Sequence, residues 1–212
     1  MNIYIADRQE ITRAGLCYVI SKIPDADYKY TPDKAELVNA LKTNGKAVVI
    51  VDYTLFDIND ANELLILSER FHEAQWIIFS VDLSVDFART IIASSPHIGI
   101  VLKESPLVEI QEAIDFAARG RRYICQRMTE MLLTPETAQE EQVKLTKTET
   151  EILKDIALGM TTREIAEKRF SSFHTVNTHR KNIFRKLGVN NVHEATKYAL
   201  RAGLVDEAEY YI

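Results

Sequence analysis

Residues 145–203 read LTKTETEILKDIALGMTTREIAEKRFSSFHTVNTHRKNIFRKLGVNNVHEATKYALRAG. Three times in this stretch a threonine or asparagine stands three residues before a glutamate, the spacing of a capping box that starts a helix. The pairs are Thr146 with Glu149, Thr161 with Glu164, and Asn191 with Glu194. Gly159, Gly188 and Gly203 stand where the helices should end. The stretch therefore predicts four short helices, near 147–158, 162–169, 173–187 and 192–202.

The second and third of these helices form a predicted helix-turn-helix. Residues 170–172 make a tight turn, with Ser172 as the N-cap of the third helix. Its inward stripe consists of Val176, Ile183 and Leu187, which leaves a basic, amide-bearing set mostly outward: Asn177, Thr178, Arg180, Lys181 and Arg185. In a major groove, Asn can bond adenine, and Lys or Arg can bond guanine or phosphate. The alternative is a solvated amphipathic helix. His179 could contact phosphate or pack against the second helix.

This region resembles the LuxR-type DNA-binding domain across its whole length. The resemblance rests on LTKTETEIL at 145–153, Gly159, REIA at 163–166, Ser172, Thr175-Val176, His179 and IFRKLGV at 183–189. It implies a DNA-contacting set made of Ser172, Thr175, Asn177, Thr178 and Lys181, with Arg185 and Lys186 near phosphates. Asn177 replaces a lysine that is common in the family, so the base preference is expected to differ.

The last helix carries Ala195, Tyr198, Ala199 and Ala202 on one side, and resembles the helix that pairs two such domains on a palindromic site. A single helix-turn-helix buries on the order of 600–1,000 Å² of protein surface on DNA, so two copies are needed for useful affinity. We therefore expect a homodimer.

Charge divides the chain. The formal net charge is -5, but residues 1–132 hold 14 basic and 19 acidic residues, whereas residues 146–203 hold 11 basic and 6 acidic ones. Binding to a polyanion is therefore expected of the second part, because phosphate neutralisation depends on local charge. The longest apolar runs fall far short of the ~20 residues of a membrane helix. No secretory signal pattern opens the chain. We expect a cytoplasmic protein without membrane contact.

The first 120 residues alternate between short β-branched apolar stretches and segments of helical period. Strands are predicted at 3–6, 27–30, 47–51, 76–79 and 98–102, and helices near 10–22, 33–43, 60–72, 84–94 and 106–118. Right-handed crossovers between buried parallel strands give an α/β fold with a doubly wound, five-stranded parallel sheet. A small all-α helix-turn-helix domain follows it.

Four polar residues close the predicted strands: Asp7, Asp52, Ser80 and Lys103. Because ligands of such sheets bind at the carboxyl ends of the strands, all four are expected in one pocket. A carboxylate can act as a nucleophile, another can attract a divalent ion, and the hydroxyl and ammonium can bind a phosphoryl group. Each residue alone could be ordinary loop chemistry.

Residues 1–120 resemble the receiver domain of a bacterial response regulator, and IADRQEITRAGL at 5–16 is similar to that family's opening segment. The resemblance implies phosphorylation at Asp52, with Ser80 as the switch hydroxyl and Lys103 as the pocket lysine. Three positions depart from the family. Arg8 replaces a second acid, the usual Met-Pro and Gly are missing after Asp52, and Ile100 replaces the switch aromatic.

Arg8 bears on metal binding. Mg²⁺ requires hard oxygen ligands, whereas a guanidinium offers none and adds a positive charge. Asp7 and Asp52 are the candidate Mg²⁺ ligands, and we expect weak binding there. Arg8 could instead pair with Asp52, or point outward while Mg²⁺ binds with fewer ligands. Our hypothesis is that phosphorylation of Asp52 is weak or absent.

The two parts are joined by residues 121–144. RRYICQRMTEML after Gly120 is predicted to be an extension or short helix outside the sheet, and residues 133–144 with Pro135 a linker. The predicted domains are thus 1–120, receiver-like, and 145–212, LuxR-type.

Together, the resemblances imply a response regulator of the NarL/FixJ type, whose receiver controls dimerisation and promoter binding. A sensor histidine kinase and RNA polymerase are the further partners this implies. One rival keeps the fold but makes the receiver a phosphate-independent interaction module. Another is a phosphatase of the haloacid dehalogenase type, but Thr54 stands where that class has its second aspartate. We therefore expect no enzymatic activity.

Overall fold

The computed structural model of the chain describes residues 1–81, 83–134, 145–202 and 204–205. The chain folds as two compact units, the first within Met1–Pro135 and the second spanning Glu136–Ile212. Most of the predicted linker at 133–144 and the predicted helix-ending Gly203 lie outside the described residues.

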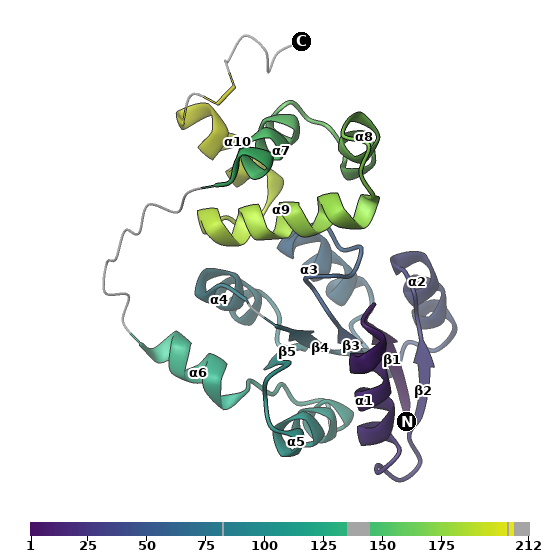
Figure 1. The fold of residues 1–212 in the computed structure, drawn as a ribbon. Coiled ribbons are helices and arrows are strands. Elements are labelled where there is room, and N and C mark those ends of the chain that lie inside the picture. The colour runs from purple at the N-terminus through teal and green to yellow at the C-terminus, as the bar shows by residue number, and fades with distance from the viewer. Residues whose placement is uncertain (82, 135–144, 203, 206–212) are drawn as a thin grey trace. The chain divides into compact units, whose positions relative to one another are not determined.

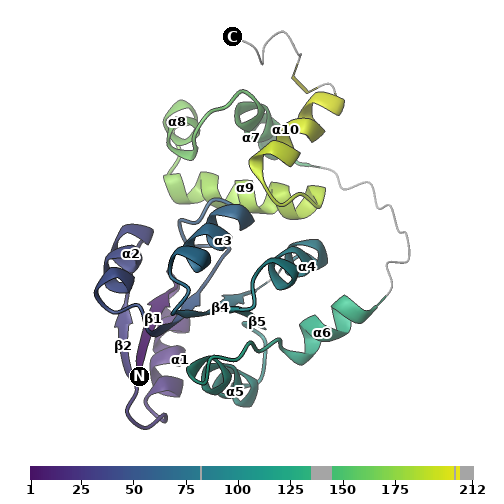
Figure 2. The same cartoon turned by 180° about the vertical axis from the view of Figure 1, so that it is seen from behind.

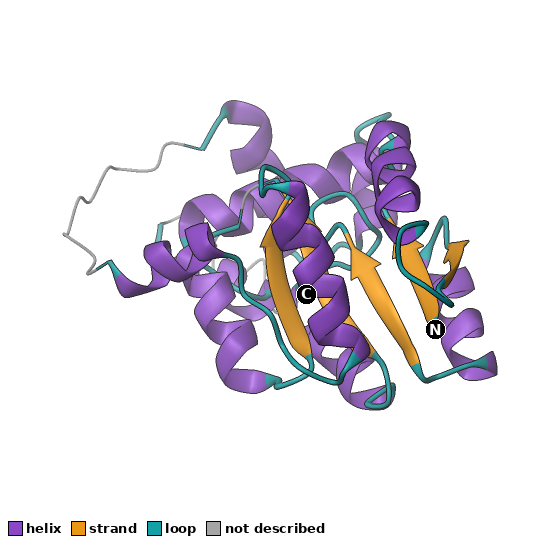
Figure 3. Ribbon diagram, turned by 90° about the horizontal axis from the view of Figure 1, so that it is seen from below, coloured by secondary structure: helices purple, strands orange, loops and turns teal. Residues whose placement is uncertain are grey.

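The first unit is built on a five-stranded parallel sheet of order β2-β1-β3-β4-β5. Its strands are β1 (Asn2–Ala6), β2 (Asp27–Tyr30), β3 (Ala47–Val51), β4 (Gln75–Ser80) and β5 (Ile98–Leu102). Every residue of β3 is buried, as expected for a central parallel strand covered on both faces. β5 is the last strand in this order, but all of its residues are buried too. All four residues of β2 are exposed, since it lies at the edge of the sheet. Figure 3 shows the strands within their helical cover.

The crossover helices are α1 (Glu10–Ile20), α2 (Lys34–Thr43), α3 (Ala61–Arg70), α4 (Val85–Ser94) and α5 (Leu107–Ala118). Helices α1 and α5 lie together on one face of the sheet, and α2, α3 and α4 cover the other (Figures 1 and 2). The core between these layers is largely aliphatic and includes Ile3, Ile50, Ile78 and Ile91. This confirms the predicted doubly wound fold, and it brings the carboxyl ends of β1, β3, β4 and β5 to one edge.

The prediction that residues 121–132 lie outside the sheet is wrong in part. They are not wholly outside the sheet: the amide of Ile100 in β5 donates to the Tyr123 carbonyl, and the amide of Cys125 donates to the Ile100 carbonyl, each at 2.9 Å. A Cβ on Gly99 would come within 2.6 Å of the Tyr123 carbonyl oxygen, so the sequence IGI in β5 admits this close strand-like pairing. Helix α6 (Gln126–Leu133) follows.

The second unit consists of α7 (Lys147–Ala157), α8 (Thr162–Lys168), α9 (Phe173–Leu187) and α10 (Val192–Arg201). Both ends of each helix lie within one residue of the prediction. The helices enclose one apolar core, in which Ile152, Ile165, Val176, Ile183 and Ala195 are nearly or fully buried.

The helix caps explain this agreement. Thr146 and Glu149, and Thr161 and Glu164, form complete capping boxes. The third predicted box is incomplete: Asn191 Oδ1 caps the Glu194 amide at 2.9 Å, but the Glu194 carboxylate accepts from the amide of Asn190, one residue before the N-cap. The box pattern therefore located this helix start correctly, although its reciprocal bond is shifted by one residue.

In the part of the chain that the structure describes, no helix has both the length and the apolar character needed to cross a membrane.

Candidate signalling pocket and nucleic-acid interface

The four polar residues predicted at the strand ends come together in the first unit. Lys103 Nζ lies 2.7 Å from Asp7 Oδ2 and 2.6 Å from Asp52 Oδ2. Ser80 Oγ donates to Asp52 Oδ1 at 3.1 Å. These residues follow or end β1, β3, β4 and β5, so the parallel topology alone explains why they meet.

Asp52 is surrounded by donors. Its Oδ1 accepts from the amides of Thr54 at 2.9 Å and Leu55 at 3.3 Å, in addition to Ser80, while its Oδ2 faces Lys103. The side chain is 1% exposed. Bonds from charged and neutral donors to the ionised form offset the cost of burying this carboxylate.

Asp7 is equally buried but less well supported. Its Oδ1 accepts from the amide of Gln9 at 2.7 Å, and its Oδ2 pairs with Lys103. Burial raises the pKa of Asp7 above its ordinary value, and the neighbouring Asp52 carboxylate acts in the same direction, whereas Lys103 and the Gln9 amide oppose the rise. Two carboxylates therefore share one ammonium, and burial disfavours the charged form of Asp7.

The donor set fits Mg²⁺ poorly. Asp7 and Asp52 each already bind the Lys103 ammonium through Oδ2, and the next residue after Asp7 is the exposed Arg8 in place of a third carboxylate. Among the described residues, no group of three or more His, Cys, Asp or Glu is arranged to hold a metal ion. A dication would have to compete with the Lys103 ammonium for both carboxylates.

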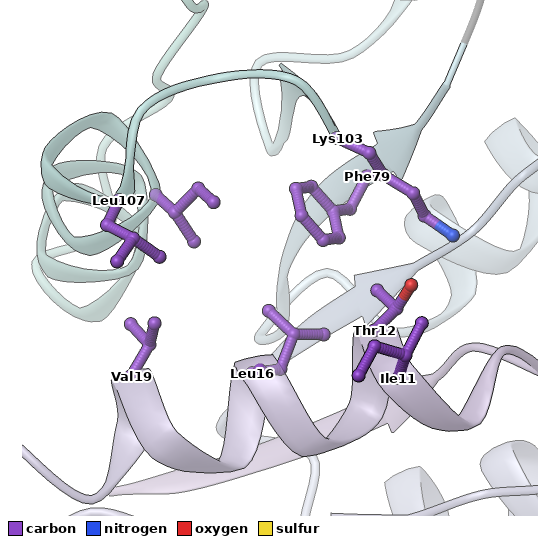
Figure 4. A pocket seen from close by; sticks show the side chains of 9 residues that line it. Ile11, Thr12, Leu16, Val19, Phe79, Lys103 and Leu107 are labelled. Atoms are coloured by element: carbon purple, nitrogen blue, oxygen red, sulfur yellow. The ribbon is translucent and has the colours of Figure 1, made fainter.

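The stem of Lys103 forms part of the wall of an apolar pocket of about 210 Å³ between α1 and α5. Figure 4 shows Lys103 and Phe79 together at one end, with Ile11, Leu16 and other α1 side chains along one side. The ammonium lies 5.9 Å from the Phe79 ring centroid.

In the second unit, the predicted turn and cap precede α9. Ser172 is the N-cap, and its Oγ accepts from the Thr175 amide at 3.0 Å. Ser172, Thr175 and Arg185 are exposed, and Thr178 is partly exposed. These four side chains present hydroxyl and guanidinium groups from the start of α9 to its last turn.

Three residues predicted to face outward are instead buried. Asn177, Arg180 and Lys181 are 1%, 4% and 5% exposed. For Arg180 the reason is local: the helical period places it within the stripe of Val176, and its guanidinium lies 5.8 Å from the Phe184 ring centroid. The period does not account for the burial of Lys181, which lies roughly 140° around the helix from Val176.

Lys186, predicted near phosphates, is held by an ion pair. Its Nζ lies 2.7 Å from Glu149 Oε2, and the Glu149 side chain is 6% exposed. Burial tends to raise the pKa of Glu149, but hydrogen bonds from Lys186 and Thr146 outweigh it, so this pKa is lowered. Nothing in the local pattern at Lys186 marks this partner, which lies 37 residues earlier.

A second ion-pair cluster was also missed. Asp155 is 3% exposed and pairs at 2.7 Å with both Lys168 and Arg169. Arg169 further contacts Glu151 at 3.2 Å. Desolvation opposes but does not outweigh these carboxylates, so the pKa of Arg169 is raised. The cluster joins α7 to the end of α8.

Both units are similar to known proteins. Residues 143–199 match the family model of bacterial regulatory proteins, luxR family. Oxygen regulatory protein NreC of Staphylococcus carnosus is 28% identical over 97% of this chain and 100% of its own length, and its Staphylococcus aureus counterpart is 26% identical. The solved structure of RcsB from Salmonella enterica serovar Typhimurium bound to promoter P1flhDC has a TM-score of 0.57 at 23% identity, covering 93% of this chain and 97% of that one.

Over nearly its whole length the chain is similar to response regulators, and residues 143–199 match the luxR family. The response regulator ChrA of a heme-sensing two-component system shares the fold as well, with a TM-score of 0.51 at 23% identity over 96% of this chain and 98% of its own. The family match covers α7, α8, α9 and most of α10. The first unit accordingly has a receiver fold, and the second is similar to the luxR-family helix-turn-helix domain.

Proposed function

We propose that this chain is a response regulator that binds promoter DNA as a homodimer through the start of α9, and that its receiver pocket acts without Mg²⁺-dependent phosphorylation. The observation that carries the DNA-binding part is the luxR family match over a second unit whose α9 follows a capped turn. The regulatory part rests on the Lys103 ion pairs and Arg8.

Ser172, Thr175 and Thr178 are the proposed contacts at the groove entrance, and Arg185 is the proposed phosphate contact. Asn177 and Lys181 contact base edges in this proposal, which requires that their buried side chains become accessible when DNA is bound. Lys186 contributes to phosphate binding only by giving up its ion pair with Glu149.

The structures of RcsB include one described as two dimers bound to two parallel DNAs. By analogy, two copies of this regulator place two α9 helices on adjacent half-sites, which doubles the interface that a single helix-turn-helix offers. A partner kinase and a contact with RNA polymerase remain predictions.

A phosphate-independent interaction module is the form of receiver that this pocket favours. Two departures from the receiver pattern support it: Arg8 stands in place of the second acid, and the switch-aromatic position is held by Ile100, which is fully buried. Such a receiver maintains one state of its pocket without a phosphoryl group.

One experiment tests both parts. Genomic fragments are selected with the wild-type chain and with Asp52→Ala, at one fixed salt concentration because affinity depends on salt. We expect the same sites and similar enrichment with both proteins. No enrichment with either protein would refute DNA binding, and loss of enrichment with Asp52→Ala alone would refute phosphate independence.

A further inference from the structure

The turn between α8 and α9 contains an unusual residue, Phe170. Helix α8 ends in a Schellman motif: the amide of Phe170 donates to the Glu167 carbonyl at 3.3 Å, and the amide of Ser171 donates to the Ala166 carbonyl at 2.9 Å. This motif requires a left-handed backbone at its penultimate residue, and Phe170 has φ of 50°.

Three other helices of this chain end in the same motif and can be compared with α8. Helices α5, α7 and α9 end with the same pair of bonds, and there the left-handed residue is Gly120, Gly159 or Gly188. In the described part of the chain, the other non-glycine residue with positive φ is Asp25, a type that tolerates this region. A bulky Phe does not tolerate it well, because its Cβ crowds the backbone.

Phe170 is also 99% exposed. A ring in water gains nothing from burial in the folded chain, so it does not offset the backbone cost of its position. Glycine would be more stable at this position and would remove an apolar group from the surface. Phe170 thus has a backbone cost that its exposed ring does not offset, which is the pattern expected of a side chain kept for binding.

Charge identifies the kind of partner. From Lys168 to His193 the sequence holds six basic residues and no acidic one. Phe170 stands in this stretch two residues before Ser172, the N-cap of α9, whose helix dipole adds positive potential at its start. A partner of this surface should be anionic and should offer apolar groups beside its charges. Duplex DNA does so, because thymine methyl groups line the major groove between two rows of phosphates.

We propose that Phe170 is a DNA-contacting residue that packs its ring against a thymine methyl group where α9 enters the major groove. This inference rests on the proposed DNA binding and adds to it an apolar readout at the turn, outside the polar face of α9. Phe170 adds preference for thymine at one position of each half-site.

The test uses the full chain and a duplex selected by it from a random pool. Phe170→Gly should raise the dissociation constant roughly 5- to 30-fold, because a largely buried Phe contact is lost. The same variant should raise the midpoint of thermal unfolding of the second unit by roughly 3–6 °C, because Gly accepts positive φ. Binding and stability therefore move in opposite directions. Phe170→Asn, which also tolerates this backbone, should behave alike.

The proposed contact with a thymine methyl group is tested by replacing each thymine of the duplex in turn with uracil, which removes only the methyl group. At one position per half-site, uracil should weaken wild-type binding roughly fourfold and leave Phe170→Gly unaffected. Leu158→Asn is the control, since Leu158 is 43% exposed at the end of α7 and outside the proposed interface. It should leave the affinity unchanged.

Unchanged affinity of Phe170→Gly would overturn the proposal, and so would weaker binding with reduced thermal stability, because that indicates a structural role. Absence of any uracil-sensitive position coupled to Phe170 would also overturn it. Loss of promoter activation with unchanged DNA affinity would assign Phe170 to a protein partner instead. Failure of the wild-type chain to select any duplex refutes the proposed function itself, and this inference with it.

Discussion

Lys103, at the end of β5, holds Asp52, at the end of β3, in an ion pair 2.6 Å long, although β4 lies between the two strands in the sheet. The same ammonium pairs with Asp7 at 2.7 Å. One lysine therefore ties together three strand ends, and the pocket has a defined arrangement in the absence of a phosphoryl group. Its stability should depend on that lysine.

Lys103→Met should lower the free energy of unfolding of the first unit by about 3–5 kcal/mol at neutral pH, because it leaves two carboxylates buried without a counter-charge. Urea denaturation measures this. Lys34→Met is the matched control: the Lys34–Glu63 pair has the same 2.6 Å length, but its side chains are 32% and 27% exposed. A partly exposed pair contributes about 0–1 kcal/mol. Equal losses in the two variants would contradict the role given to Lys103.

Asp7 should make stability depend on pH. Burial raises its pKa above the ordinary value of 3.8. In the pH window above 3.8 and up to the raised pKa, the folded chain keeps a proton that the unfolded chain releases, so stability falls as pH rises through that window. Asp7→Asn, which stays neutral, should be more stable than wild type at pH 7, and the difference should shrink to nothing in acid.

Urea denaturation from pH 3 to pH 8 measures this difference. Asp86→Asn is the control at a carboxylate that is 51% exposed, and its effect should stay within about 0.5 kcal/mol. A destabilised Asp7→Asn at neutral pH would mean that the ion pair with Lys103 outweighs the burial of Asp7.

Arg8 should determine whether Asp52 accepts phosphate. Arg8→Asp restores a carboxylate and removes a positive charge beside the pocket, so Mg²⁺ affinity should rise by at least about tenfold. Intact mass after incubation with Mg²⁺ and a small phosphodonor should then show a phosphorylated fraction that the wild-type chain lacks. Arg8→Ala separates the two effects, because it removes the charge without adding a ligand. Stoichiometric phosphorylation of the wild-type chain would reject our hypothesis.

Local signals explain how much the sequence could predict. Capping boxes and C-terminal glycines are read within one helix, and α9 was located from Ser172 and Gly188 without error in its bounds. The pocket was predictable too, because parallel topology fixes where strand ends meet. Which ions pair inside it depends on side-chain distances, and the role of Lys103 toward Asp7 emerged only from the structure.

Partners distant in sequence were beyond the local pattern. Lys186 looked like one more cation on a basic helix, but it pairs with Glu149 in the first turn of α7. The burial of Asn177 and Lys181 was likewise hidden, because helical period reports only the direction of a side chain from its own axis. The strand-like pairing of residues 123–125 requires Gly99, whose meaning within β5 is clear only when Tyr123 lies against it.

Lys181→Ala should weaken binding to the selected duplex by about 1–3 kcal/mol, as loss of a base or phosphate contact does. A gel-shift titration at fixed salt measures it. If Lys181 contacts a phosphate, the slope of affinity against salt should also fall by about one. An unchanged titration would remove Lys181 from the interface and leave Asn177 as the proposed base-edge contact of the polar face of α9.

Unlike Lys181→Ala, Lys186→Met should mainly lower the stability of the second unit. It leaves the buried Glu149 carboxylate without its cation, which costs about 2–3 kcal/mol of unfolding free energy. Because the pKa of Glu149 is lowered in the folded chain, its contribution is present above the ordinary pKa of 4.5 and is lost as pH falls through the lowered value. The loss in Lys186→Met should therefore be full at pH 7 and small in acid. Urea denaturation at both pH values measures it, and an equal loss at both would show that Lys186 stabilises α9 through packing of its stem instead.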